Sequence, residues 1–125
     1  MTVAEMCMIA AIILPYVWVG VAKAGPKFDN AAPREQLANA EGYRQRANWA
    51  QQNAWEALAP FLAAVLFAEM RQAPQSTVDL LAGLFIGCRV LHGVVYIANQ
   101  ATLRSLIWAV GFFSMLAIFV TAARG

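Results

Sequence analysis

Charged residues are scarce in this chain of 125 residues. Asp, Glu, Lys and Arg make up 13% of it, whereas 61% of its residues are hydrophobic. A typical soluble domain has roughly 25% charged and 45–50% apolar residues. The formal charge is only +2 and no basic cluster is dense, so nucleic acid is not an expected partner. The deficit of charge indicates an integral membrane protein with a single domain, residues 1–125.

Motifs for metals and nucleotides are also missing. The chain has two cysteines and one histidine, and it contains no CxxC, P-loop, GxGxxG or GxSxG pattern. Cys7 and Cys88 lie in apolar runs, where a buried thiol behaves as a small hydrophobic group. Together with the single His92 they do not supply the ligands of a zinc site, so we expect no metal.

Long uncharged runs are what the sequence has in excess. Met6 to Ala22 and Ser105 to Ala123 carry no charge, and each is about long enough to cross the ~30 Å hydrocarbon core. Two further stretches have a helical pattern but carry charges. The predicted fold is an all-α bundle of four transmembrane helices, at about residues 3–22, 46–70, 78–99 and 104–123.

The first run could instead be a cleaved signal peptide, because residues 22–24 resemble a cleavage site. However, Glu5 precedes the run and no Lys or Arg does, so we favour a true membrane span. Pro15 and Pro60 fall inside predicted helices, which we expect them to kink without ending.

The connections differ in length. The polar segment from Lys23 to Gly42 contains Pro26 and Pro33, and we expect a loop without a regular helix there. At about 20 residues it is longer than most connections, which indicates a working role or a docked position. The connections at 72–77 and 101–104 are short, so the third and fourth spans should form an antiparallel hairpin.

Basic residues are distributed unevenly over this topology. Arg71 and Arg124 lie on one side of the predicted membrane. The other side has Lys23, Lys27, Arg34, Arg44, Arg46 and Arg104. The positive-inside rule therefore predicts a cytoplasmic first loop with both termini outside, in the inner membrane if the protein is bacterial. The expected interface anchors are Trp18, Trp49 and Trp108.

Two of the predicted spans carry polar stripes at membrane depth. On the second span, one face about 80° wide holds Arg46, Trp49, Asn53, Glu56 and Pro60. On the third span, a similar face holds Arg89, His92, Tyr96 and Asn99. Charges in hydrocarbon are costly, so these stripes should face other helices or a polar ligand. Gly83 and Gly87 lie away from the second stripe as a GxxxG pattern, which would allow close helix approach.

With Arg104 at the cytoplasmic end, these residues hold more cations than carboxylates. Such a set suits an anionic or zwitterionic ligand, because arginines bind carboxylates bidentately and Glu56 could accept from an ammonium. The simpler interpretation is that Arg89 pairs with Glu56 and only joins two helices. The candidate residues are Arg46, Asn53, Glu56, Arg89, His92, Tyr96 and Arg104.

Residues 46–56, RANWAQQNAWE, resemble the RAxxAQxNxxE signature of the MAPEG family, the membrane-associated proteins in eicosanoid and glutathione metabolism. The pattern Arg89-x2-His92-x3-Tyr96, followed by Arg104, is similar to the family's second block. The plan of four spans and a long first loop resembles the family over essentially the full chain. The chain departs from the eicosanoid branch at Trp49, where that branch has an arginine, and at His92, where it has a tyrosine. The interval from Tyr96 to Arg104 also looks one residue longer.

The resemblance implies a homotrimer with glutathione bound between neighbouring subunits at the cytoplasmic side. It implies that Arg104 stabilises the glutathione thiolate, because a nearby guanidinium favours the ionised form of a thiol whose free pKa is ~8.5. The expected activity is that of a glutathione-dependent transferase or peroxidase acting on lipophilic electrophiles in contact with membrane lipids. The implied glutathione contacts are Arg46, Asn53, Glu56, Arg89, His92 and Tyr96.

Two other functions stay open. A non-enzymatic scaffold or lipid-binding protein of the same fold would use a buried Arg46–Glu56–Arg89 network only to fix the trimer. A small multidrug-type transporter would resemble its class through an embedded glutamate in the first helix. Here Glu5 lies at the extreme end and the embedded carboxylate is in the second span, so we rank the transporter last.

Overall fold

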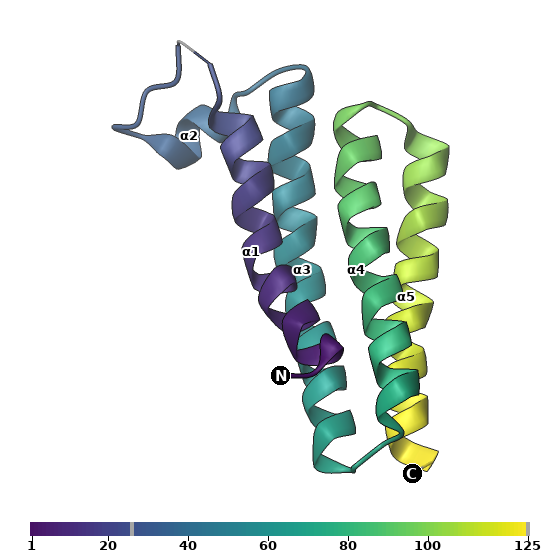
Figure 1. Cartoon of the computed structure of the whole chain (residues 1–125). Coiled ribbons are helices and arrows are strands. Elements are labelled where there is room, and N and C mark those ends of the chain that lie inside the picture. Colours follow the sequence, from purple (N-terminus) through teal and green to yellow (C-terminus); the bar gives the residue numbers. More distant parts are fainter. Residues whose placement is uncertain (26, 125) are drawn as a thin grey trace.

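The computed structural model describes residues 1–25 and 27–124. Four long helices lie alongside one another, α1 (Val3–Lys23), α3 (Tyr43–Met70), α4 (Gln75–Ile97) and α5 (Ala101–Arg124), with a short helix α2 (Pro33–Ala38) at one end (Figure 1). Within the described ranges, α1, α4 and α5 are long and apolar enough to cross a membrane. Helix α3 has 28 residues, but its first half is largely polar.

A local sequence signal accounts for the start of α1, and two of the long helices contain an internal proline. Helix α1 begins at a capping box in which the Thr2 hydroxyl accepts from Glu5 N at 3.1 Å and the Glu5 carboxylate accepts from Thr2 N at 2.9 Å. Pro15 lies within α1 and Pro60 within α3, and neither ends its helix, as the sequence predicted.

The first connection is not the helix-free loop that the sequence predicted. Pro33 begins helix α2, because proline is tolerated in the first turn, where its missing N–H would have no helical partner. Leu37 of α2 is buried with Ala22 and Ala47, and its carbonyl accepts from Asn48 Nδ2 at 3.4 Å. The connection is therefore docked against α1 and α3. Pro26, also expected to interrupt helix formation, lies outside the described residues.

The turn between α4 and α5 is earlier than predicted. Residues 101–104 form the first turn of α5 rather than a connection, and α4 ends at Ile97. Asn99 has φ 62°, a left-handed conformation that asparagine tolerates, and Gln100 N donates to Val95 O at 2.9 Å. Asn99 thus ends the helix and does not share the polar face of α4.

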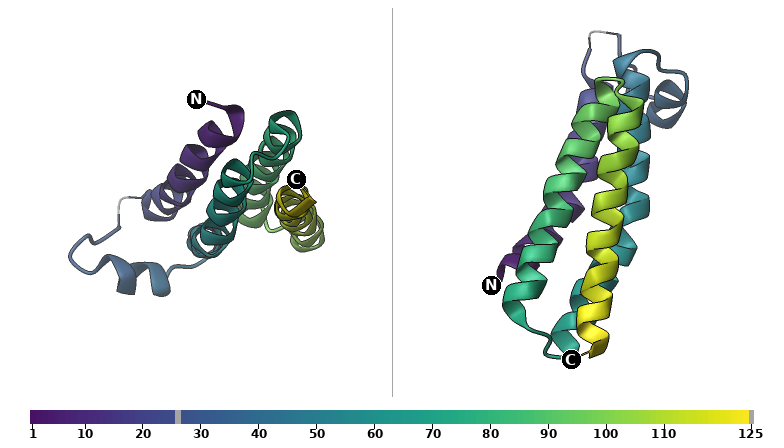
Figure 2. Two further views of the ribbon diagram at one scale, coloured as in Figure 1. Left: turned by 90° about the horizontal axis from the view of Figure 1, so that it is seen from below. Right: turned by 90° about the vertical axis from the view of Figure 1, so that its right-hand side faces the viewer.

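Helix α3 is the central element. It contacts α1, α4 and α5, and in the end-on view it lies between α1 and the α4–α5 pair (Figure 2). The main core cluster includes Phe61, Val65 and Ile118, and the rings of Phe61 and Phe85 stack with centroids 4.1 Å apart. The long loop and the α4–α5 turn lie at one end of the bundle, opposite the α3–α4 turn (Figure 1).

Three arginines near the ends of α3 bind the carboxyl ends of the other long helices. Arg44 Nε donates to Ala22 O of α1 at 2.9 Å, and Arg46 Nε donates to Ile97 O of α4 at 2.9 Å. Arg71 Nε donates to Ala122 O of α5 at 3.4 Å. The last carbonyls of a helix have no helical donor and carry the negative end of its dipole. A guanidinium therefore supplies the missing hydrogen-bond donor and a favourable positive charge. Helix α3 thereby holds the carboxyl ends of the three neighbouring helices.

Trp18 is not the interface anchor that the sequence predicted. It is only 6% exposed and packs with Ala50 and Ala54 of α3. Its ring lies where a side chain on Gly93 would be. Trp49 and Trp108, the other expected anchors, are 42% and 41% exposed.

The fit of Trp18 against Gly93 gives a stability prediction. Gly93→Ala should destabilise the protein by about 1–3 kcal/mol, because the new Cβ overlaps the Trp18 ring and the core must shift. Thermal unfolding in detergent would measure the fall. Gly83→Ala is the control, because nothing lies within 4 Å of its added Cβ, and alanine is the better helix former. Equal effects of the two substitutions would contradict this packing.

Candidate functional site

Two neighbouring hollows open where α3, α4 and α5 meet, and they share Asn53 and Trp108. The inner hollow, of about 220 Å³, is lined by Asn53, Glu56, Ala57, Pro60, Phe85, Arg89, Trp108, Phe112 and Met115. The outer hollow, also about 220 Å³, is lined by Asn53, His92, Tyr96, Arg104, Ser105 and Trp108. The inner hollow is polar at one end and apolar at the other, whereas polar side chains and aromatic rings are mixed around the outer one.

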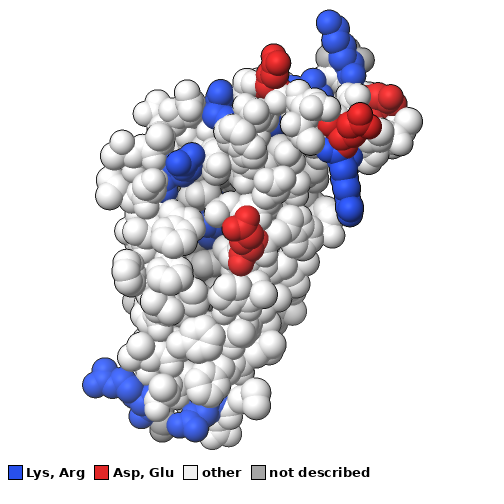
Figure 3. Space-filling model, turned by 180° about the vertical axis from the view of Figure 1, so that it is seen from behind, with Lys and Arg blue, Asp and Glu red and all other residues white. Residues whose placement is uncertain are grey.

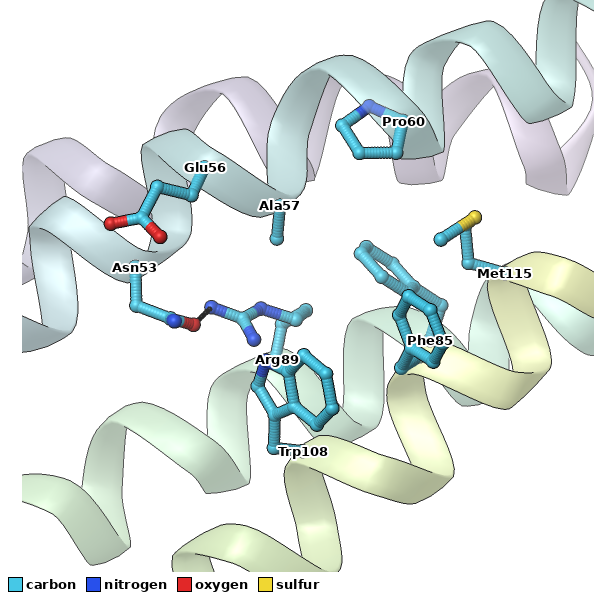
Figure 4. Close-up of a pocket in the computed structure, with 9 residues that line it drawn as sticks. Asn53, Glu56, Ala57, Pro60, Phe85, Arg89, Trp108 and Met115 are labelled. Carbon is cyan, nitrogen blue, oxygen red and sulfur yellow. Dashed lines mark hydrogen bonds between the residues drawn. The ribbon is translucent and has the colours of Figure 1, made fainter.

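Arg89 is the deepest charged group of the inner hollow. It comes from α4, is 5% exposed, and donates through Nη2 to Asn53 Oδ1 of α3 at 2.6 Å (Figure 4). This is its one side-chain hydrogen bond within the described residues. A guanidinium has five N–H donors, so the rest of the group remains available to water or to a ligand in the hollow.

Glu56 lies beside this pair without binding it. Its side chain is exposed and lines the inner hollow; in Figure 4 the dashed hydrogen bond joins Arg89 to Asn53 instead. The simple Arg89–Glu56 pairing considered from the sequence is therefore not what the protomer forms. The Arg46–Glu56–Arg89 network is not formed within it either, because Arg46 binds the Ile97 carbonyl. The Glu56 carboxylate remains available to a cationic group.

The outer hollow gathers aromatic and basic groups. The Arg104 guanidinium lies 4.5 Å from the centroid of the Tyr96 ring, a cation–π contact that positions it. The edge-on contact between the rings of His92 and Tyr96 has a centroid distance of 5.5 Å. His92 is 3% exposed, and its Nδ1 has no hydrogen-bond partner among the described residues.

The surface around the hollows carries little other charge. Figure 3 shows most charged side chains at the two ends of the molecule, and between them a hollow with basic and acidic groups at its edge. A shallower depression beside it is lined by Trp49, Gln52, Asn53, Glu56 and Tyr96. The polar site is therefore set into an otherwise apolar stretch of the bundle.

The structure brings six of the seven predicted site residues around the two hollows and leaves Arg46 apart from them. Apart from Arg104, the sequence prediction missed the wall that α5 contributes. Arg104, Trp108, Phe112 and Met115 are spaced at about one helical turn and lie along one face of α5. That spacing could have revealed the wall, but three of these residues are apolar in an apolar helix and do not stand out.

Fold and site together define the class of the protein, an all-helical integral membrane protein with a charged site among its helices. The family model described as the MAPEG family matches residues 3–124, nearly the whole chain. The chain therefore belongs to the MAPEG family, as its motifs suggested. This membrane family includes glutathione-dependent transferases and peroxidases as well as non-enzymatic members. Comparisons with curated proteins and with solved structures gave no match.

The Arg89–Asn53 bond gives a second stability prediction. Asn53→Ala should destabilise the protein by about 1–3 kcal/mol, because it leaves a buried guanidinium without its protein acceptor. Adding Arg89→Leu should recover part of that loss, since the unpaired charge is then removed as well. Unfolding of the single and double variants in detergent would measure the coupling. Additive effects of the two substitutions would show that the bond contributes nothing.

Proposed function

We propose that this protein is a glutathione-dependent transferase or peroxidase that acts on lipophilic electrophiles. The observation that carries the proposal is the meeting of predicted ligand residues from three helices around two neighbouring hollows. The residues are Asn53, Glu56, Arg89, His92, Tyr96 and Arg104. Membership of the MAPEG family makes glutathione the leading ligand.

The chemistry of the lining suits a tripeptide that carries both carboxylate and ammonium groups. The free donors of Arg89 and the amide of Asn53 can bind a carboxylate, and the Glu56 carboxylate can accept from an ammonium. The Arg104 guanidinium, held on the Tyr96 ring, would lie near the thiol and lower its pKa, so that more of it is the nucleophilic thiolate. An electrophile dissolved in the membrane would then enter along the wall of Phe112 and Met115 and meet the thiolate near Arg104, about two helical turns away on α5.

We propose that α3 crosses the membrane together with α1, α4 and α5, and that the protein is a homotrimer. Gln52 and Glu56 are exposed on the protomer in the middle part of the bundle, where contact with hydrocarbon would be costly. A neighbouring subunit would cover them and complete the site. The basic residues at the α2 end favour a cytoplasmic first loop with both termini outside.

Glutathione binding and conjugation test the activity. The detergent-purified protein should bind glutathione and conjugate it to a chlorodinitrobenzene-type acceptor. Arg104→Ala should lower the rate at neutral pH by about tenfold or more and move the pH profile to higher pH, because the thiol then ionises less readily. Titration calorimetry and rates as a function of pH would measure both effects.

Arg124→Ala is the matched control, because Arg124 is the last residue of α5 and lines neither hollow. It should leave binding and rate unchanged. Absence of binding at millimolar glutathione, or wild-type rates in Arg104→Ala, would contradict the proposal and favour a non-enzymatic member of the family.

The proposed assembly has a test of its own. Native mass spectrometry in detergent should give a particle of three times the 13.6 kDa chain mass. Glu56→Leu should still assemble but lose glutathione binding, because it removes the ammonium acceptor without adding a buried charge. A monomer of full binding activity would contradict the shared site.

A further inference from the structure

A third hollow lies at the α2 end of the bundle, apart from the two hollows of the candidate site. It has a volume of about 350 Å³ and shares no lining residue with either of them. Its walls come from the end of α1, from the first connection with α2, and from the start of α3. The polar residues of its lining are Lys27, Gln36, Asn39, Glu41 and Arg44.

This hollow lies at the level where the membrane-crossing part of α1 ends. The uncharged run of α1 ends at Ala22, which lines the hollow, and Lys23 follows it. Helix α1 has 21 residues, so at ~1.5 Å per residue it is about 30 Å long, which is the thickness of the hydrocarbon core. A hollow beside its end is therefore at the depth of the phospholipid headgroups.

Arg44 is held in the wall of this hollow. Its Nε donates to Ala22 O at 2.9 Å, and its guanidinium lies over Gly25, where an added Cβ would be 3.3 Å from Nη1. Gly25 has φ 147°, a conformation that other residues rarely adopt, so its backbone and its missing side chain both make room for the guanidinium. No acceptor among the described residues binds the two Nη groups, which remain available to an anion.

The other charged residues of this hollow are Lys27 and Glu41. Both are exposed, and Figure 3 shows basic and acidic side chains close together at this end of the molecule. With Arg44 they supply two cations and one carboxylate around a single hollow. Lysine and arginine bind phosphate oxygens, and a carboxylate accepts from a primary ammonium. The set is complementary to a small group that carries both a phosphate and an ammonium.

We propose that the hollow at the α2 end binds the headgroup of a phosphoethanolamine lipid from the adjoining leaflet. The lipid phosphate binds Arg44 and Lys27, and the ethanolamine ammonium binds Glu41. This site is independent of the proposed glutathione site, because the two share no residue.

Lipid titrations of the full chain, delipidated in detergent and followed by native mass spectrometry, test the headgroup. Dioctanoyl phosphatidylethanolamine should bind. Phosphatidylcholine of the same chain length should bind more weakly, because its trimethylated nitrogen has no N–H to donate to Glu41. Glu41→Gln should remove the difference between the two lipids.

Lys27→Ala tests the phosphate contact. It should lower the affinity for the ethanolamine lipid about threefold, which is the size expected for one exposed ion pair. Arg34→Ala is the matched control. It removes a positive charge at the same end of the molecule, but Arg34 is exposed on α2 and does not line this hollow, so the affinity should not change. Both side chains are exposed, and neither substitution should affect folding.

Several results would overturn the inference. Equal losses in Lys27→Ala and Arg34→Ala would show attraction by overall charge rather than binding in the hollow. Equal binding of the two lipids by the wild type, or an unchanged preference in Glu41→Gln, would remove the role of Glu41. Water-soluble glycerophosphoethanolamine has no acyl chains and should compete only weakly. Competition as strong as that of the lipid would assign the hollow to a free phosphate ester instead.

Discussion

A guanidinium buried among helices of a membrane protein needs acceptors, and this need shapes the structure around Arg89. Asn53 supplies one acceptor from the neighbouring helix, but a single amide oxygen cannot satisfy five N–H donors. A fully packed apolar surrounding would leave the remaining donors unsatisfied at high cost. The hollow beside Arg89 is therefore a consequence of the charge, because only water or a polar ligand can complete its hydrogen bonds.

Helix α3 serves both the fold and the site. The arginines near its two ends bind the carboxyl ends of α1, α4 and α5, and its apolar second half holds the main core through Phe61 and Val65. Between these parts, Asn53 and Glu56 face the hollows. The low hydropathy of α3 thus reflects its polar residues, which bind neighbouring helix ends and line the hollows. It does not argue against a place in the membrane.

Helical periodicity predicted much of the site because it is a local property. The spacing of Asn53 and Glu56, and of Arg89, His92 and Tyr96, was enough to put each set on one face. Partners distant in sequence were not predictable in this way. Arg46 lies on the same stripe as Asn53 but binds the carbonyl of Ile97, and Trp18 is buried because Gly93 leaves room for its ring. The short helix at Pro33 and the turn at Asn99 depend on backbone geometry that composition alone did not reveal.

We propose that the hollow beside Arg89 exists to hold a polar ligand. A structure of the assembled protein in the presence of glutathione tests it most directly. We predict ligand density that contacts the Arg89 guanidinium and extends past Asn53 towards Arg104. A hollow filled by side chains of a neighbouring subunit, with Arg89 fully bonded to protein, would contradict the account.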